Sequence, residues 1–158
     1  MIDENIHLKW MTLAINEAEQ AVDKGEVPVG CVIVNDGKVI AKSHNLVETL
    51  NDATAHAEMM AITSASENLG SKVLEGCSMY VTLEPCAMCA GAIILSKISN
   101  LYFGAYDPKA GACGSVMNIV ENPQMNNTIS VYGGILDYMS LDLLKNFFAD
   151  KRNINKKS

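Results

Sequence analysis

The chain has 158 residues, of which 49% are hydrophobic and 19% charged, as expected for one globular domain with a sizeable core. Its formal net charge of −6 does not indicate a general nucleic-acid binder, and no apolar run reaches the roughly 18 residues of a membrane helix. The acidic and polar start MIDENIHLKW lacks the features of a secretory signal. We therefore expect a cytoplasmic protein without a membrane segment.

The first half of the chain predicts a helix, a hairpin and a second helix. Apolar residues recur with a helical period over 6–24, and Gly25 ends this pattern. The apolar run VGCVIV at 29–34 predicts a buried strand, and the turn signal NDG at 35–37 leads into a partner strand, KVIAKSHN. After a polar loop over 46–54, a helical pattern follows from about 55 to 68.

The second half predicts further strands that alternate with helices. Strands are expected at 79–83, 100–106 and 129–134, and helices at 86–96, 115–120 and 137–149, with DPKAGACGS as a loop. This order predicts an α/β fold with one mixed, five-stranded sheet covered by helices on both faces. No linker, repeat or low-complexity stretch divides the chain, so we expect a single domain over 1–158.

The charge is unevenly distributed along the chain. From residue 145 to the end, five basic residues and one acidic residue give a net charge of +4, so the remainder carries −10. By charge alone, a basic segment over 151–158 is typical of a solvated and partly frayed C-terminus.

The five cysteines raise the question of what Cys86 and Cys89, three residues apart in TLEPCAMCAG, are for. An odd number of cysteines in a reducing compartment argues against a disulfide framework. Cys31 lies in a core strand, and Cys77 and Cys113 are interpreted as small packing residues. Cys86 and Cys89 are candidates for a redox pair, for half of a metal site or for core packing.

His56, in TAHAEMMA, completes a candidate metal site. One histidine and two cysteines are ligands that zinc prefers, and three protein ligands leave the fourth position open for a water, as in catalytic sites. Zinc lowers the pKa of such a water to about 7, and Glu58 is then placed to move its proton. A thioredoxin-type redox pair does not explain the sequence HAE, and a structural zinc normally has four protein ligands.

Local signals agree with this interpretation. Pro85 favours a helix start, which places Cys86 and Cys89 in its first turn, where thiolates are stabilised. His56 begins a second helix. Residues two apart on a regular helix point about 200° apart, so His56 must lie outside the regular helix if Glu58 is to face the same site.

The motifs HAE at 56–58 and PCAMC at 85–89 match the H-x-E…P-C-x-x-C signature of the zinc nucleoside and base deaminases. Within this superfamily the chain resembles the tRNA-specific adenosine deaminase family, through EVPVG (26–30), VTLEPCAMCAGAI (81–93) and FGAYDPKAGACGS (103–115). The resemblance covers nearly the whole chain. It implies a three-layer α/β/α sandwich, a homodimer, one Zn²⁺ per chain and deamination of the wobble adenosine in a tRNA anticodon to inosine.

The resemblance also implies a role for individual residues. His56, Cys86 and Cys89 would bind the zinc, and Glu58 would be the proton shuttle. Six further residues would bind the substrate: Asn45, Asp107, Lys109, Phe148, Lys151 and Arg152. Among these, Asn45 would hold the target nucleoside, Asp107 and Lys109 would border the nucleotide, and the last three would meet the anticodon stem-loop.

Two other functions are compatible with the same motifs. A free-base or nucleotide deaminase, acting on guanine, cytosine or deoxycytidylate, would use the same zinc chemistry, but the aromatic and basic residues from Phe148 to Arg152 disfavour it. A non-catalytic RNA-binding subunit could keep zinc for its fold, but such a site has no use for Glu58.

Overall fold

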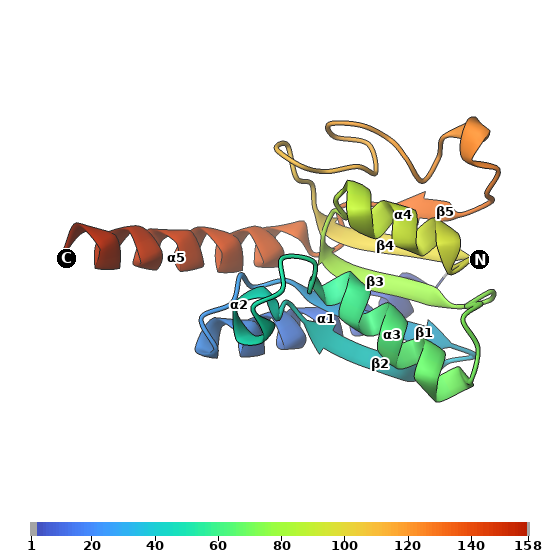
Figure 1. Ribbon diagram of the computed structural model, residues 1–158, viewed down its shortest axis with the longest axis horizontal. Coiled ribbons are helices and arrows are strands. Elements are labelled where there is room, and N and C mark those ends of the chain that lie inside the picture. The colour runs from blue at the N-terminus through green and yellow to red at the C-terminus, as the bar shows by residue number, and fades with distance from the viewer. Residues whose placement is uncertain (1–2, 158) are drawn as a thin grey trace.

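The computed structural model describes residues 3–157, which form three layers (Figure 1). In chain order the elements are α1 (Glu4–Asp23), β1 (Gly30–Asn35), β2 (Lys38–His44), α2 (Val47–Leu50), α3 (Ala57–Leu69), β3 (Ser78–Leu83), α4 (Ala87–Leu95), β4 (Asn100–Ala105), the 3₁₀ turn η1 (Pro123–Met125), β5 (Ser130–Tyr132) and α5 (Asp137–Lys156). The predicted α/β class, the three-layer sandwich and the mixed five-stranded sheet are confirmed.

The strands lie in the order β2-β1-β3-β4-β5. β1 pairs antiparallel with β2 and β3, whereas β3, β4 and β5 run parallel to one another. The carboxyl ends of β3 and β4 therefore lie at the same edge of the sheet, which is where open α/β sheets bind ligands.

Two apolar clusters cover the two faces of the sheet, because successive strand residues point to opposite sides. On β1, Cys31 and Ile33 face the cluster that includes α3 and α4. Their neighbours Val32 and Val34 face the cluster that includes α1. α5 packs on β4 and also contacts α1, so it lies on the α1 side. Both faces are thus buried, as parallel strands require.

Gly30 sets the distance between α1 and the sheet. A Cβ at this position would overlap the backbone carbonyl of Ala14 and the backbone nitrogen of Ala18. The small side chains of Ala14 and Ala18 are fully buried at this contact. α1 therefore packs directly against the start of β1, and only glycine fits there.

Three segments differ from the prediction. The polar loop over 46–54 contains the short helix α2. Residues 115–120 are not helical, because the Val116 and Met117 N–H groups bond to Gly111 and the Ile119 N–H bonds to Ala112, outside any helical pattern. α5 was predicted to end at 149 but continues to Lys156, through most of the segment expected to be frayed. Ser158 lies outside the described residues.

Between residues 3 and 157, no helix combines the length and apolar content that crossing a membrane requires.

Candidate active site

Two helix starts meet at the carboxyl end of β3. His56 is the N-cap residue of α3, and Cys86 is the N-cap residue of α4, both with extended backbone. Neither side chain caps its own helix, so both are free to face a common point. Pro85 precedes the N-cap, and α4 begins at Ala87, one residue later than predicted. Because His56 lies outside the regular helix, Glu58 in the first turn of α3 can face the same site.

The spacing of His56, Cys86 and Cys89 fits a tetrahedral zinc ion. The Nδ1 atom of His56 lies 3.6 Å from the Sγ atom of Cys86 and 3.6 Å from that of Cys89. All three ligand atoms lie within 4.8 Å of one another. Zn–S bonds of about 2.3 Å and Zn–N bonds of about 2.0 Å at tetrahedral angles place nitrogen and sulfur about 3.5 Å apart, close to the separations found here. The donor set and its geometry therefore fit zinc.

The local electrostatics favour a thiolate. The pKa of Cys86 is lowered to about 3, first by its contact with the Cys89 thiol and then by that with His56. The pKa of Cys89 is raised by the same contact with Cys86 and by burial. The hydrogen bond with Cys86 raises the pKa of His56. The pair thus holds one negative charge beside the histidine, at a helix N-terminus that stabilises it.

A cavity of about 350 Å³ adjoins this cluster. Its lining includes His56, Cys86 and Glu58. The Glu58 side chain is 4% exposed, and burial raises the pKa of its carboxyl group. A carboxyl group beside an open metal position, shielded from bulk water, suits proton transfer to and from a substrate in the cavity.

Asn45 also lines this cavity. It is 8% exposed, and its Oδ1 atom is buried without a hydrogen-bond partner. An unpaired buried acceptor is costly, so such a group in a cavity indicates a ligand that supplies the donor. The preceding residue, His44, is held by Glu17 and Lys24, at 2.9 and 3.0 Å, which fixes the end of β2 where Asn45 begins the loop.

Residues 4–105 match the model of the cytidine and deoxycytidylate deaminase zinc-binding region, which is more than half of the chain. The chain is 46% identical over 147 residues to a tRNA-specific adenosine deaminase of Bacillus subtilis (strain 168), covering 93% of this chain and 91% of the relative. A tRNA-specific adenosine deaminase of Aquifex aeolicus (strain VF5) is 48% identical over 144 residues, covering 91% and 95%. The chain belongs to the tRNA-specific adenosine deaminase family.

A solved structure supports the same relationship. A chain from structural studies of A-to-I editing by tRNA:A34 deaminases at the wobble position of transfer RNA superimposes with a TM-score of 0.83 at 46% identity. The match covers 86% of this chain and 99% of that chain.

The loop after β4 forms a further wall of the cavity in this deaminase. Asp107 lines the cavity, whereas Lys109 is exposed and lies outside the lining. The Oδ1 atom of Asp107 accepts hydrogen bonds from the backbone N–H groups of Lys109 and Ala110, at 3.0 and 3.2 Å. Asp107 therefore caps a turn with one oxygen while its carboxylate borders the cavity.

The last helix reaches the cavity through one of the three residues predicted on it. Lys151 lines the cavity, and its Nζ atom lies 5.5 Å from the ring centre of Phe147. Phe148 is 41% exposed, Arg152 is exposed, and both lie outside the lining. In Figure 1, α5 projects well beyond the sheet, so its C-terminal half is open to a large ligand.

Two buried carboxylates of the cavity wall were missed by the sequence analysis. Glu26 is fully buried and accepts hydrogen bonds from the N–H groups of Glu48 and Thr49 and from the Thr49 hydroxyl. Glu84 is 2% exposed and is bonded to the loop after β4. The only local signal for either residue is an acidic residue inside an apolar stretch, EVPVG and VTLEPC.

Proposed function

We propose that this protein deaminates the wobble adenosine of a tRNA anticodon to inosine, consuming one water and releasing one ammonia. The observation that carries this proposal is the His56, Cys86 and Cys89 cluster, which opens into a cavity containing the buried Glu58 and the unpaired Asn45. The tRNA-specific adenosine deaminases that are 46% and 48% identical to this chain support tRNA as the substrate.

One zinc ion per chain would be held by His56 Nδ1 and by the Sγ atoms of Cys86 and Cys89. When bound, zinc supplies a Lewis acid whose open position lowers the pKa of a water molecule to about 7. The backbone of these three residues is held at the N-termini of α3 and α4. The protein thus presents three ligand atoms that already lie close together.

Glu58 would carry the protons of the reaction. Its carboxylate accepts a proton from the attacking water and donates one to the adenine ring nitrogen next to the reacting carbon, C6. It then takes the second proton of that water, from the hydroxyl now on C6, and passes it to the amine; the C=O bond forms as the C–N bond breaks, and the amine departs as ammonia. Glu58 is the buried carboxylate next to the ligand cluster, whereas Glu26 and Glu84 already accept hydrogen bonds from neighbouring loops.

The cavity takes a base that has left the stack. Anticodon loops are single-stranded, so a base can be turned outward at modest cost. The unpaired Oδ1 of Asn45 would accept a hydrogen bond from the nucleoside. Asp107, in the loop after β4, lines the same cavity and would contact the same nucleotide.

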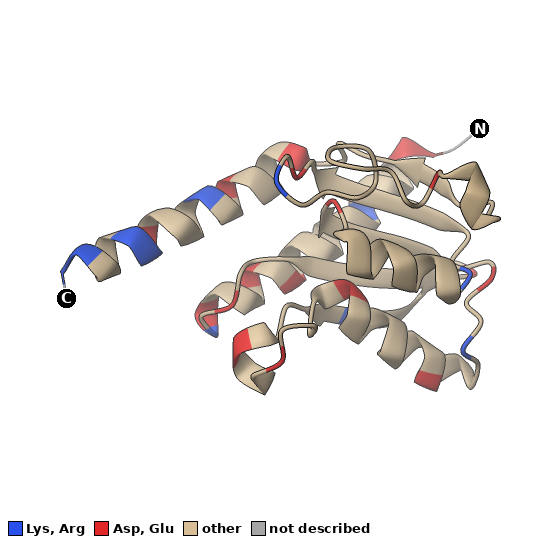
Figure 2. Cartoon of the chain, turned by 45° about the horizontal axis from the view of Figure 1, so that its top comes forward, with Lys and Arg blue, Asp and Glu red and all other residues tan. Residues whose placement is uncertain are grey.

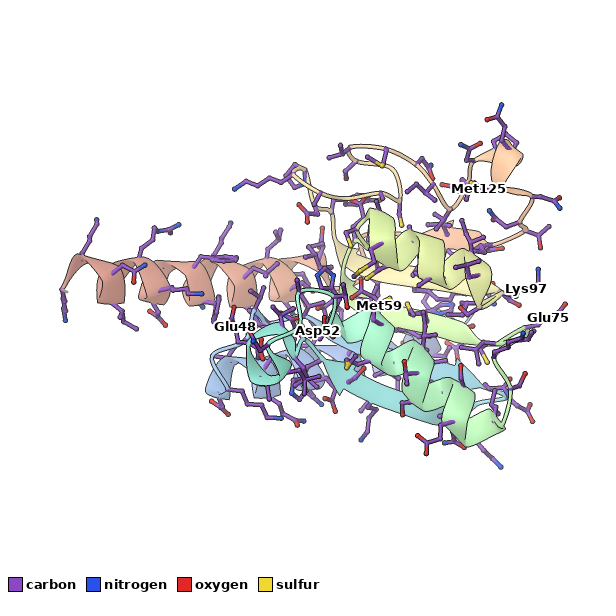
Figure 3. The ribbon with its side chains drawn as sticks, in the orientation of Figure 1. Glu48, Asp52, Met59, Glu75, Lys97 and Met125 are labelled. Carbon is purple, nitrogen blue, oxygen red and sulfur yellow. The ribbon has the colours of Figure 1, made fainter. Side chains whose placement is uncertain are left out.

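Charge favours an approach of RNA along α5. Figure 2 shows Lys and Arg gathered on the projecting half of α5, while Asp and Glu mark α2 and the end of α1. In Figure 3, Glu48 is labelled on α2 and Asp52 in the loop that follows it, and Met59 marks the start of α3. A polyanion is attracted to the first surface and repelled by the second. We assign Phe148, Lys151 and Arg152 to the anticodon stem-loop, and Lys109 to a flanking nucleotide.

We further propose a homodimer. Ala57, Ala61 and Ala65 of α3 are fully buried against the sheet, so they do not form its surface. Large apolar side chains are exposed nearby, with Leu95 at 83% and Met125 at 43%, and both line one surface depression. Light scattering at micromolar concentration should give twice 17.1 kDa, and a mass near 17.1 kDa would contradict the proposal.

A cytoplasmic location is proposed on two grounds. The proposed substrate is a tRNA, and the five cysteines are all unpaired, as expected in a reducing compartment.

The deciding experiment incubates the purified protein with an anticodon stem-loop that carries a wobble adenosine, and separately with guanine, cytosine, adenosine and deoxycytidylate. Inosine in the stem-loop, with no ammonia from the small substrates, is the expected result. Ammonia from a free base or nucleotide alone would establish the other deaminase function. Tight stem-loop binding without product would indicate a non-catalytic RNA-binding protein.

A further inference from the structure

Glu84 accepts four hydrogen bonds from a single loop. Its Oε1 atom accepts the Asp107 N–H at 3.0 Å and the Ser115 hydroxyl. Its Oε2 atom accepts the Cys113 N–H at 3.0 Å and the Ser115 N–H at 3.1 Å. Three of the four donors are backbone groups, spread over both ends of the segment 107–115.

The surroundings of Glu84 fit a carboxylate group and exclude other side-chain groups of similar size. A Cβ at Gly111 would overlap the Glu84 carboxylate, so the loop closes tightly around it. Each carboxylate oxygen receives at least one backbone N–H. In either orientation of a glutamine side chain at this position, its NH2 group would face one of these N–H donors. At least one buried backbone N–H would then lose its hydrogen-bond acceptor.

The position of Glu84 connects the loop to the metal ligands. It follows β3 directly and precedes Pro85 and Cys86 in the chain. The Ala112 N–H also bonds to the Pro85 carbonyl at 2.8 Å. The turn that presents Cys86 and the loop that presents Asp107 to the cavity are therefore held to each other at one place.

We propose that Glu84 is a positioning residue, which fixes the substrate-binding loop 107–115 relative to the metal ligands by acting as its internal hydrogen-bond acceptor. It touches neither the metal nor the reacting atoms. Its effect on catalysis, which rests on the proposed function, is to hold Asp107 and Ala110 against the substrate nucleotide. Hydrogen-bond partners that orient metal ligands typically contribute about 10- to 100-fold to activity, and we expect a similar contribution from Glu84 to the orientation of the loop.

The test compares three variants by two measurements. Hydrogen exchange of the backbone amides in 107–115 is measured without substrate, and steady-state kinetics are measured on the anticodon stem-loop. Glu84→Gln should exchange at least about tenfold faster in this loop, keep its zinc, and lose about 10- to 100-fold in kcat/KM, mainly through KM. Ser115→Ala, which removes one of the four hydrogen bonds, should show a smaller change in the same direction.

Ile15→Val is the matched control for stability. Ile15 is 1% exposed on α1 and lies outside the cavity lining. Removal of one buried methyl group in Ile15→Val should lower Tm without a selective change in KM or in the hydrogen exchange of residues 107–115. Unchanged exchange and KM in Glu84→Gln would overturn the proposal, as would loss of stability alone, matching Ile15→Val. If the wild type does not deaminate the stem-loop, the proposed function fails, but the exchange data still decide whether Glu84 holds the loop.

Discussion

Replacing Glu58 with glutamine should abolish turnover while leaving the metal in place. The substitution keeps the shape of a side chain that is 4% exposed and removes only its ability to accept and donate protons. The other carboxylates that line the cavity cannot replace it: Glu26 and Glu84 are bonded to loops, one oxygen of Asp107 caps a turn, and Glu48 is exposed to solvent. With no substitute group, the loss should reach the upper part of the range for general acid–base catalysis, about 10³- to 10⁴-fold.

That loss corresponds to about 4 to 5 kcal/mol of transition-state stabilisation, at 1.36 kcal/mol per tenfold change in rate. Single-turnover kinetics on an anticodon stem-loop measure it, because they separate the chemical step from product release. Elemental analysis should give the same zinc content as the wild type, whereas His56→Ala, the control, should lose both zinc and activity. The reasoning is refuted if Glu58→Gln loses zinc as readily as His56→Ala, or retains a rate within tenfold of the wild type.

Three other substitutions test separate parts of the molecule. Cys86→Ala should lose zinc and unfold at a lower Tm, because metal binding is coupled to folding; a Tm that chelation of the wild type does not change would contradict this. Burial alone would raise the pKa of Glu26, but hydrogen bonds from Thr49 and the Glu48 and Thr49 N–H groups outweigh it and hold the pKa below 4.5. The ionised Glu26 carboxylate therefore stabilises the fold above pH 4.5, and this stabilisation is lost as the pH falls through the lowered pKa. Glu26→Gln should lower the free energy of urea unfolding by about 1.5–3 kcal/mol at pH 7 and by less below pH 4.5. A difference between variant and wild type that does not change with pH would contradict this prediction. Asp107→Asn should lower the ratio of turnover on RNA to turnover on a matched DNA hairpin, because the wild-type carboxylate can accept a hydrogen bond from a ribose 2′-OH, which DNA lacks. An unchanged ratio together with a lower Tm would show that Asp107 only stabilises the turn.

The clustering of His56, Cys86 and Cys89 could be predicted from the sequence because the signals that place these residues are local. A proline before Cys86 and a change to helical periodicity after His56 are enough to indicate two helix starts, and ligands at N-cap positions are not buried under their own helices. The element order likewise fixes the α/β class, since strands separated by helices pair in parallel.

The features that the sequence did not predict depend on contacts between distant residues. Glu84 bonds to residues 23 to 31 positions away, and nothing in its neighbours indicates this. The expected helix at 115–120 was wrong for the same reason: the Ser115 N–H goes to Glu84, so the backbone follows the loop rather than its apolar pattern. The extension of α5 past residue 149 could not be read from periodicity, because beyond the sheet no apolar face is needed to hold it.

A protein with a net negative charge can bind RNA through a local group of cationic side chains that lies beside its active site. Here the segment from residue 145 onward carries +4 while the remainder carries −10, and the structure extends that segment as a helix away from the acidic body. Lys151 lies both on this helix and in the cavity lining, so the surface that attracts a phosphate backbone leads directly to the proposed metal site. Glu48, the acidic residue of α2, also lines this cavity. Attraction to the cations of α5 and repulsion by Glu48 would favour a single orientation of the stem-loop, the one proposed to present the wobble base to Glu58.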